Sequence, residues 1–127
     1  VLGVSHDTTI SGVVKAAKTY GGKVMVDMID VHDLKKRAME IDQLRVDYIC
    51  VHTAFDLQAS GANPLAELEV VKGVLVNAKA GVAGGVKLAT IAAIAALKPE
   101  IVVVGGGITN QSDPLTAAKT LKERMSL

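Results

Sequence analysis

Two glycine pairs in the last third of the chain are the residues best suited to hold an anion. Gly84 and Gly85 follow one short apolar run, and Gly105 and Gly106 follow the next. A strand that ends in glycine exposes backbone N–H groups to a ligand oxygen, and a helix that begins there adds positive partial charge. Loops after the last two strands of barrels commonly bind phosphate in this way. The pattern therefore predicts a phosphate cradle, with tight packing at strand ends as the alternative.

Polar side chains near other strand ends are candidates for ligand contact. His52 follows an apolar run, at the end of a strand where a barrel places catalytic groups. It is either a residue of the site or a residue that orients its loop through a hydrogen bond. Asp56 and Gln58 either contact substrate or shape their loop, and Thr109 either adds a hydroxyl to the cradle or caps a helix. Asp27 lies inside an apolar strand, where a carboxylate is costly unless it is paired. We expect Asp27 either to face the site or to pair with a lysine outside this chain.

Three further residues have simpler interpretations. His6 and His32 are expected to be solvated loop residues, and Cys50 is expected to be a buried, inert thiol because it lies within an apolar run. The spacing of His and Cys residues is not that of a metal site, so no metal ligand is predicted in this chain.

The composition is that of a globular chain with an aliphatic core. Of 127 residues, 50% are hydrophobic, 2% aromatic and 21% charged, which suits parallel strands buried on both faces. The formal charge of +1 gives no electrostatic reason to expect nucleic acid or an anionic membrane as a partner. The single cysteine fits the cytoplasm. No secretory signal is found, and no apolar run reaches the roughly 18 residues of a membrane span.

Apolar spacing predicts strands and helices in alternation. Strands are expected over residues 1–4, 23–29, 47–51, 81–83 and 100–104, and helices over residues 8–20, 34–44, 64–77, 87–97 and 113–125. Asp33 is expected to cap the second helix, and Pro64 to begin the third. Asp33–Arg37 and Lys36–Glu40 are available as surface pairs. Strand then helix, with short connections, implies parallel strands joined by right-handed crossovers.

Two α/β architectures fit this alternation, and the position of the glycines separates them. A dinucleotide-binding fold should carry G-x-G-x-x-G after its first strand and an acidic residue about 20 positions later, and this sequence has neither. A (β/α)8 TIM barrel places its phosphate glycines after its last strands, as they occur here. The sequence therefore favours the barrel.

The number of strand–helix units is too small for a closed barrel. A barrel needs eight units and at least about 200 residues, whereas the pattern gives four complete units and the end of a fifth strand. We therefore expect residues 1–127 to be one unit, the C-terminal half of a phosphate-binding (β/α)8 barrel, with a start that is cut rather than native.

Five short motifs, taken in order, carry a family resemblance. They are VMVDMI at 24–29, VDYICVHT at 46–53, DLQASG at 56–61, AGGVKL at 83–88 and VGGGIT at 104–109. Together they resemble the 3-hexulose-6-phosphate synthase family, part of the orotidine 5′-monophosphate decarboxylase superfamily of phosphate-binding barrels. The resemblance covers essentially the whole chain.

The resemblance implies a lyase of formaldehyde fixation in the ribulose monophosphate pathway. In this aldol reaction formaldehyde adds to D-ribulose 5-phosphate, giving D-arabino-hex-3-ulose 6-phosphate, with Mg²⁺ stabilising the enediolate. The resemblance assigns proton transfer to His52 and the phosphate grip to the two glycine pairs. It also implies a homodimer. The family's metal ligands and catalytic lysine are expected upstream of Val1, so this chain is expected to need its other half-barrel for turnover.

Three positions depart from the patterns of related enzymes. Ala54 stands where the family usually has glycine. Phe55 and Gly106 stand where related decarboxylases of 3-keto-L-gulonate 6-phosphate carry arginines. Without the cation at 55 a decarboxylase loses its proton donor, which favours the synthase. The alternatives are such a decarboxylase, an epimerase of another sugar phosphate, or a non-catalytic phosphate-binding half-barrel that self-associates.

Overall fold

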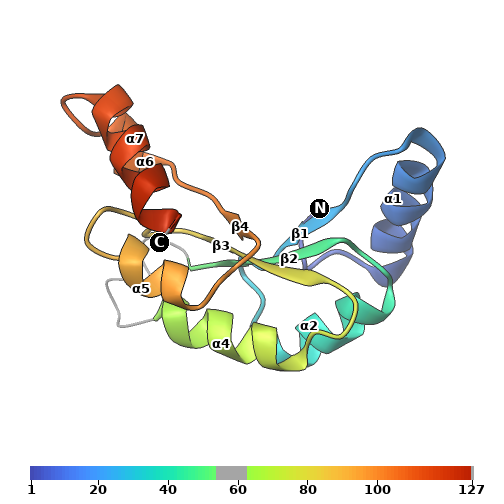
Figure 1. The fold of residues 1–127 in the computed structure, drawn as a ribbon. Coiled ribbons are helices and arrows are strands. Elements are labelled where there is room, and N and C mark those ends of the chain that lie inside the picture. Colours follow the sequence, from blue (N-terminus) through green and yellow to red (C-terminus); the bar gives the residue numbers. More distant parts are fainter. Residues whose placement is uncertain (54–62, 127) are drawn as a thin grey trace.

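Strands and helices alternate through the computed structural model, which describes residues 1–53 and 63–126. Four parallel strands form one sheet in the order β1-β2-β3-β4 (Figure 1). They are Met25–Asp27 (β1), Tyr48–His52 (β2), Lys79–Ala83 (β3) and Ile101–Val102 (β4). Strands that are consecutive along the chain are also neighbours in the sheet, as in a barrel. The predicted parallel alternation is confirmed.

Helices precede β1, separate the strands and follow β4. They are Asp7–Tyr20 (α1), Leu34–Gln43 (α2), Pro64–Val74 (α4), Ile91–Ala96 (α5), Gly106–Thr109 (α6) and Pro114–Met125 (α7). The side chains of Asp33, Asn63 and Asp113 cap α2, α4 and α7 by accepting hydrogen bonds from first-turn N–H groups. The predictions of a cap at Asp33 and a helix beginning at Pro64 are confirmed.

The segments at the two edges of the sheet are shorter than expected. Instead of a strand over residues 1–4, only Leu2 forms a bridge with Asp27 of β1. β4 covers two residues of the expected 100–104, although the N–H of Val103 still donates to a carbonyl of β3. Within the described residues each edge segment has a neighbouring strand on one side only, so fewer hydrogen bonds hold it extended.

The segments after the two glycine loops also differ from the prediction. The helix expected over residues 87–97 begins only at Ile91. The Thr90 hydroxyl accepts a hydrogen bond from the Lys87 N–H and also contacts the Gly85 carbonyl, which holds a turn ahead of the helix. The short helix α6 was not predicted, because a run of glycines has low helix propensity.

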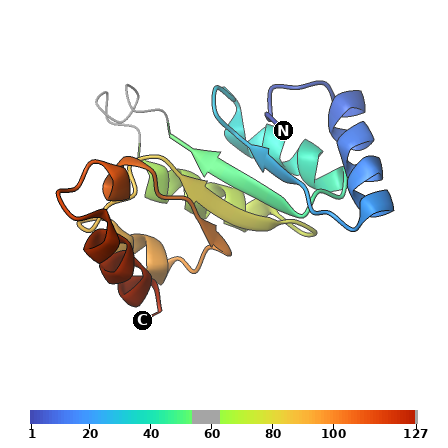
Figure 2. The ribbon, with the colours of Figure 1, turned by 90° about the horizontal axis from the view of Figure 1, so that it is seen from above.

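The sheet has one covered face and one open face. Successive side chains of a strand point to opposite faces. The side chains of the covered face are buried against the helices that pack on it. They are Val26, Ile49, Val51, Ala80 and Val82. Figures 1 and 2 show α2 and α4 beneath the sheet, with α1 on the side of β1 and α7 on the side of β4. No described helix crosses the other face.

The open face carries the polar residues that the sequence singled out. Asp27, Cys50 and His52 point to it together, because Asp27 is the register partner of Cys50 and His52 lies two residues further along β2. Cys50 is only 1% exposed, as predicted. Burial, together with the negative charge of Asp27, raises the pKa of its thiol to about 12. Cys50 therefore stays a neutral thiol at physiological pH.

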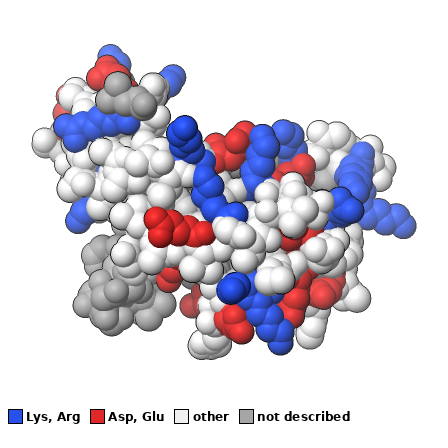
Figure 3. Space-filling model, turned by 60° about the horizontal axis from the view of Figure 1, so that its bottom comes forward, with Lys and Arg blue, Asp and Glu red and all other residues white. Residues whose placement is uncertain are grey.

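Both signs of charge are interspersed on the helix-covered side of the molecule (Figure 3). This distribution agrees with the formal charge of +1. In residues 1–53 and 63–126, no helix combines the length and apolar character needed to cross a membrane.

Candidate functional site

A histidine and a carboxylate meet at the carboxyl end of the sheet. His52 Nδ1 lies 2.9 Å from Asp27 Oδ2 and 3.1 Å from Asp27 Oδ1. Each side chain is about one-third exposed, at 32%. The carboxylate is held in turn by the N–H of Ile29. Within the described residues the partner of Asp27 is His52, and the part of Asp27 in a ligand site stays a prediction.

This pairing gives the imidazole a defined orientation. A carboxylate at Nδ1 accepts a hydrogen bond from the ring and favours the tautomer with its proton on that nitrogen. Nε2 is then the nitrogen that can exchange a proton with a ligand. The arrangement can serve as a general base or acid at the open face.

The first glycine loop packs directly on the end of β2. Gly84 and Gly85 have φ values of +81° and +64°, a region that side chains disfavour. A Cβ on Gly84 would lie 2.3 Å from the Thr53 carbonyl oxygen and 3.2 Å from Cδ2 of His52. The absence of a side chain therefore lets this loop approach the histidine.

The second glycine loop packs on the first. A Cβ on Gly107 would lie 2.3 Å from the Val86 carbonyl oxygen, so the two loops touch. Gly105 has no neighbour within 4 Å of such a Cβ, and for Gly106 the nearest atom is the Asn110 side-chain nitrogen at 2.9 Å. The close contact between the loops is thus made by Gly107, and phosphate binding at Gly105 and Gly106 stays a prediction. Three consecutive glycines were the available signal for the contact of Gly107.

Thr109 lies on the last turn of α6 and is exposed. Its hydroxyl donates to the Gly105 carbonyl at 3.4 Å. This bond lies within the short helix and is not the helix cap that the sequence offered as one interpretation, and a part for Thr109 in the cradle stays a prediction.

A cleft of about 690 Å³ opens beside His52. Its polar wall includes Asp30, His32, Thr53 and Glu67, and its apolar wall comes from residues such as Val70. Thr53 is buried and its hydroxyl donates to Glu67 at 2.7 Å. Sequence reasoning missed Glu67, because its partner lies 14 positions away and no local pattern marks it. His32 is exposed, as expected, but lines this cleft.

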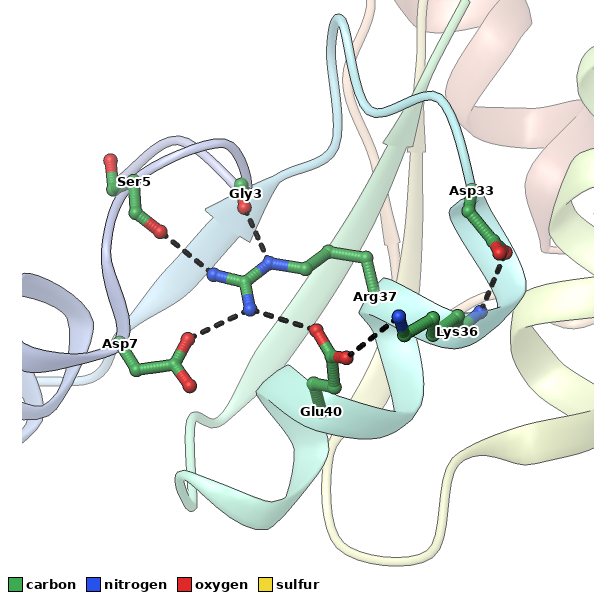
Figure 4. A network of polar contacts seen from close by, with 7 residues as sticks. All are labelled: Gly3, Ser5, Asp7, Asp33, Lys36, Arg37 and Glu40. Carbon is green, nitrogen blue, oxygen red and sulfur yellow. Dashed lines mark hydrogen bonds and ion pairs between the residues drawn. The ribbon is translucent and has the colours of Figure 1, made fainter.

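A second hollow, of about 760 Å³, lies between the N-terminal segment and α2. Arg37 organises it: the guanidinium donates to the Asp7 carboxylate at 2.7 Å and to the Glu40 carboxylate at 3.0 Å (Figure 4). It also donates to the backbone carbonyls of Gly3 and Ser5. These bonds fix the segment that follows the first edge of the sheet against α2.

The prediction of a surface ion pair between Asp33 and Arg37 is wrong. The Asp33 carboxylate caps α2 at the N–H of Lys36, and Arg37 turns to the N-terminal segment instead. The pair Lys36–Glu40 is present at 3.9 Å. His6 is exposed at the rim of the same hollow, as a solvated loop residue would be.

Some predicted residues lie outside the described part of the chain. Asp56 and Gln58 fall within residues 54–62, as do Ala54 and Phe55. Among the residues that the structure describes, no group of three or more His, Cys, Asp or Glu side chains is placed to hold a metal ion.

Solved structures share this fold. The chain superposes on 3-hexulose-6-phosphate synthase from Salmonella typhimurium with a TM-score of 0.92 at 37% identity, covering 99% of this chain and 60% of that one. It also matches KGPDC from Streptococcus mutans with a TM-score of 0.79 at 16% identity, over 98% of this chain and 58% of that one. The expected (β/α)8 barrel class is confirmed.

Curated relatives are similar over nearly the whole chain. It is 51% identical over 123 residues to 3-hexulose-6-phosphate synthase 3 of Staphylococcus saprophyticus and 50% identical over 123 residues to 3-hexulose-6-phosphate synthase of Bacillus subtilis. Each alignment covers 97% of this chain and 59% of the relative, so the chain spans about three-fifths of their length. The model of the orotidine 5′-phosphate decarboxylase / HUMPS family matches residues 1–121. The chain belongs to the orotidine 5′-phosphate decarboxylase / HUMPS family.

Proposed function

We propose that this chain is part of a 3-hexulose-6-phosphate synthase that condenses formaldehyde with D-ribulose 5-phosphate. The observation that carries the proposal is the His52–Asp27 pair, at 2.9 Å, in direct contact with the Gly84 loop. The residue that we propose for proton transfer is thus beside the proposed phosphate cradle. About half of the residues are identical to those of proteins named as this synthase.

The proposed reaction uses these groups in a simple order. The phosphate of ribulose 5-phosphate binds N–H groups of the loops at Gly84–Gly85 and Gly105–Gly106, which pins the substrate. A proton leaves the carbon next to the ketone, and the resulting enediolate carbon bonds to the carbon of formaldehyde. The oxygen of formaldehyde takes up a proton. We assign proton transfer at the enediolate to His52 Nε2, and the orientation of the ring to Asp27.

We propose that the ligands of the implied Mg²⁺ lie outside the described residues. The described part of the chain contains no cluster of side chains suited to a metal ion. The Mg²⁺ implied by the family resemblance would supply positive charge to the enediolate when bound. The catalytic lysine of the family is likewise assigned outside the described residues.

The proposal extends to the assembly of the protein. We infer that residues 1–127 are the C-terminal half of the barrel and that the open sheet face is covered by the other half-barrel or by a second copy. A cytoplasmic homodimer is the proposed working form. Sugar phosphate and formaldehyde are its proposed ligands, with no part for nucleic acid or membrane.

A decarboxylase of 3-keto-L-gulonate 6-phosphate is the second candidate. It is supported by the shared fold with KGPDC, although identity to that protein is 16%. The phenylalanine at 55 argues against it, since an arginine is expected there in a decarboxylase. A non-catalytic half-barrel that binds phosphate remains the alternative from another class, and it predicts binding without turnover.

The test is an assay of both reactions with the full-length protein that carries this sequence. Condensation of formaldehyde with ribulose 5-phosphate is expected in the presence of Mg²⁺, without decarboxylation of 3-keto-L-gulonate 6-phosphate. His52→Ala should lose about 10²–10⁴-fold in turnover, the usual contribution of a general acid or base.

His6→Ala is the matched control, because His6 is exposed and its side chain makes no capping bond to α1. It should keep the wild-type rate. Decarboxylation without condensation would replace the proposal with the second candidate, and binding without either reaction would favour the non-catalytic half-barrel. A fully active His52→Ala variant would make His52 structural.

A further inference from the structure

The carboxylate of Glu67 accepts a hydrogen bond from Thr53, the residue that follows His52. Thr53 Oγ1 donates to Glu67 Oε2 at 2.7 Å, and Thr53 is only 2% exposed. Glu67 lies in the first turn of α4, where the helix dipole stabilises a negative charge. A hydroxyl–carboxylate hydrogen bond is stronger than one between neutral groups, especially where water is excluded. This bond ties α4 to the end of β2.

The same threonine supports the first glycine loop. Because a Cβ on Gly84 would lie 2.3 Å from the Thr53 carbonyl oxygen and 3.2 Å from His52 Cδ2, the loop backbone rests on both residues. Close-packed groups transmit small displacements to their neighbours. A displacement of Thr53 would therefore be transmitted both to the histidine and to the glycine loop.

We propose that Glu67 is a positioning residue, which acts through Thr53 to keep His52 and the Gly84 loop in register. The inference rests on the proposed function, since it gives Glu67 a part in the same site. Glu67 acts through a hydrogen bond to its partner and has no chemical step of its own. A carboxamide that accepts the same bond should therefore replace it.

The kinetic test compares three variants in the full-length protein. Glu67→Ala and Thr53→Val should each lower kcat/KM for ribulose 5-phosphate by about 10-fold or more, because each removes the same charge-assisted bond. Glu67→Gln should restore the rate to within about 3-fold of wild type, since its amide oxygen accepts the Thr53 hydroxyl. The double variant Glu67→Ala/Thr53→Val should be no slower than the single ones.

A spectroscopic readout accompanies the kinetics. The NMR signals of the His52 ring should shift in Glu67→Ala and Thr53→Val and return to their wild-type positions in Glu67→Gln. Glu69→Ala is the matched control, because Glu69 is an exposed carboxylate on the same helix. It should leave both the rate and the His52 signals unchanged.

The outcomes separate this inference from the proposed function. An active wild type whose Glu67→Ala variant keeps its rate and its His52 signals would overturn the positioning role. A Glu67→Gln variant as impaired as Glu67→Ala would also overturn it, because charge rather than the bond would then matter. If Glu67→Ala does not fold, Glu67→Gln and Thr53→Val decide. A wild type without condensation would refute the proposed function, and the His52 signals would still test the positioning.

Discussion

At the scale of single residues, the site depends on side chains whose partners come from neighbouring strands. Asp27 would be costly inside an apolar strand by itself. The carboxylate is acceptable there because His52, on the adjacent strand, approaches it to 2.9 Å. The N–H of Ile29, two residues further along the chain, also donates a hydrogen bond to it. The pair thus gives a partly exposed carboxylate its partner and is also the basis of the proposed chemistry.

Asp27→Asn should lower turnover in the proposed condensation more than it lowers binding. The amide keeps the volume of the carboxylate but removes the charge that fixes the tautomer of His52. We expect kcat to fall by about 10²-fold, while KM for ribulose 5-phosphate changes by less than about 3-fold. Steady-state kinetics measure both. An equal loss in kcat and binding would instead assign Asp27 to the substrate.

Gly84→Ala should destabilise the fold by at least about 2 kcal/mol. Its φ of +81° disfavours a side chain, and the new Cβ would clash with the Thr53 carbonyl. Gly12→Ala is the control, because a Cβ there meets nothing within 4 Å in the middle of α1. It should stabilise the protein by roughly 0.5–1 kcal/mol. Urea unfolding of both variants measures the difference, and equal stabilities would contradict the packing of this loop.

At the scale of elements, one buried carboxylate joins α2 to the segment that leads into β3. Asp42 is 1% exposed and accepts hydrogen bonds from the N–H groups of Val76, Asn77 and Ala78, the last at 2.7 Å. The Asn77 side-chain amide donates to it as well. Burial alone would raise the pKa of Asp42, but these bonds prevail and lower it below the ordinary value of 3.8.

Asp42→Asn should cost roughly 3 kcal/mol of stability at pH 7, since an amide cannot accept this set of hydrogen bonds. Because the pKa is lowered in the folded state, the stabilising effect is fully present above about pH 4. It is lost as the pH falls through the folded-state value. Urea unfolding at several pH values should therefore show the gap between wild type and variant closing below about pH 4. A gap independent of pH would show that the charge has no part.

At the scale of the whole molecule, the sheet is incomplete on one face and at both edges. α2 and α4 cover one face (Figure 2). The other face carries Met25, two residues before Asp27 on β1, which is 37% exposed. Leu2 and Val103, at the two edges of the described sheet, are 48% and 42% exposed. Exposed apolar faces and unpaired strand edges favour association. Such exposed surfaces agree with a chain that spans 59% of the length of the relative that it matches.

The 127-residue chain, prepared by itself, should not persist as a monomer at micromolar concentration. Sedimentation equilibrium should give at least twice the mass of one chain. Met25→Lys should weaken the association by at least about 10-fold, because it places a charge on the open face. Tyr20→Lys is the control, since Tyr20 is 87% exposed and lies on α1 rather than on a strand of that face. A well-folded wild-type monomer would show that the sheet needs no further cover.

The sequence by itself determined the alternation of strands and helices and the barrel class of the fold, and the places where a ligand would bind stay a prediction. Alternating apolar runs and caps such as Asp33 predicted the parallel sheet and its helices, because periodicity and capping are local properties. The late glycines separated a barrel from a dinucleotide-binding fold, since each type of fold needs its glycines at a fixed position along the chain.

Only the tertiary structure decided which of these residues contact one another. The partner of Asp27 lies 25 positions away and that of Glu67 lies 14 away, distances at which no sequence period links two side chains. The close contact of Gly107 with Val86 likewise depends on how two loops stack. Such pairings follow from strand register and packing, which the whole fold sets, so the sequence pattern left Asp27 with two alternatives and did not indicate Glu67 at all.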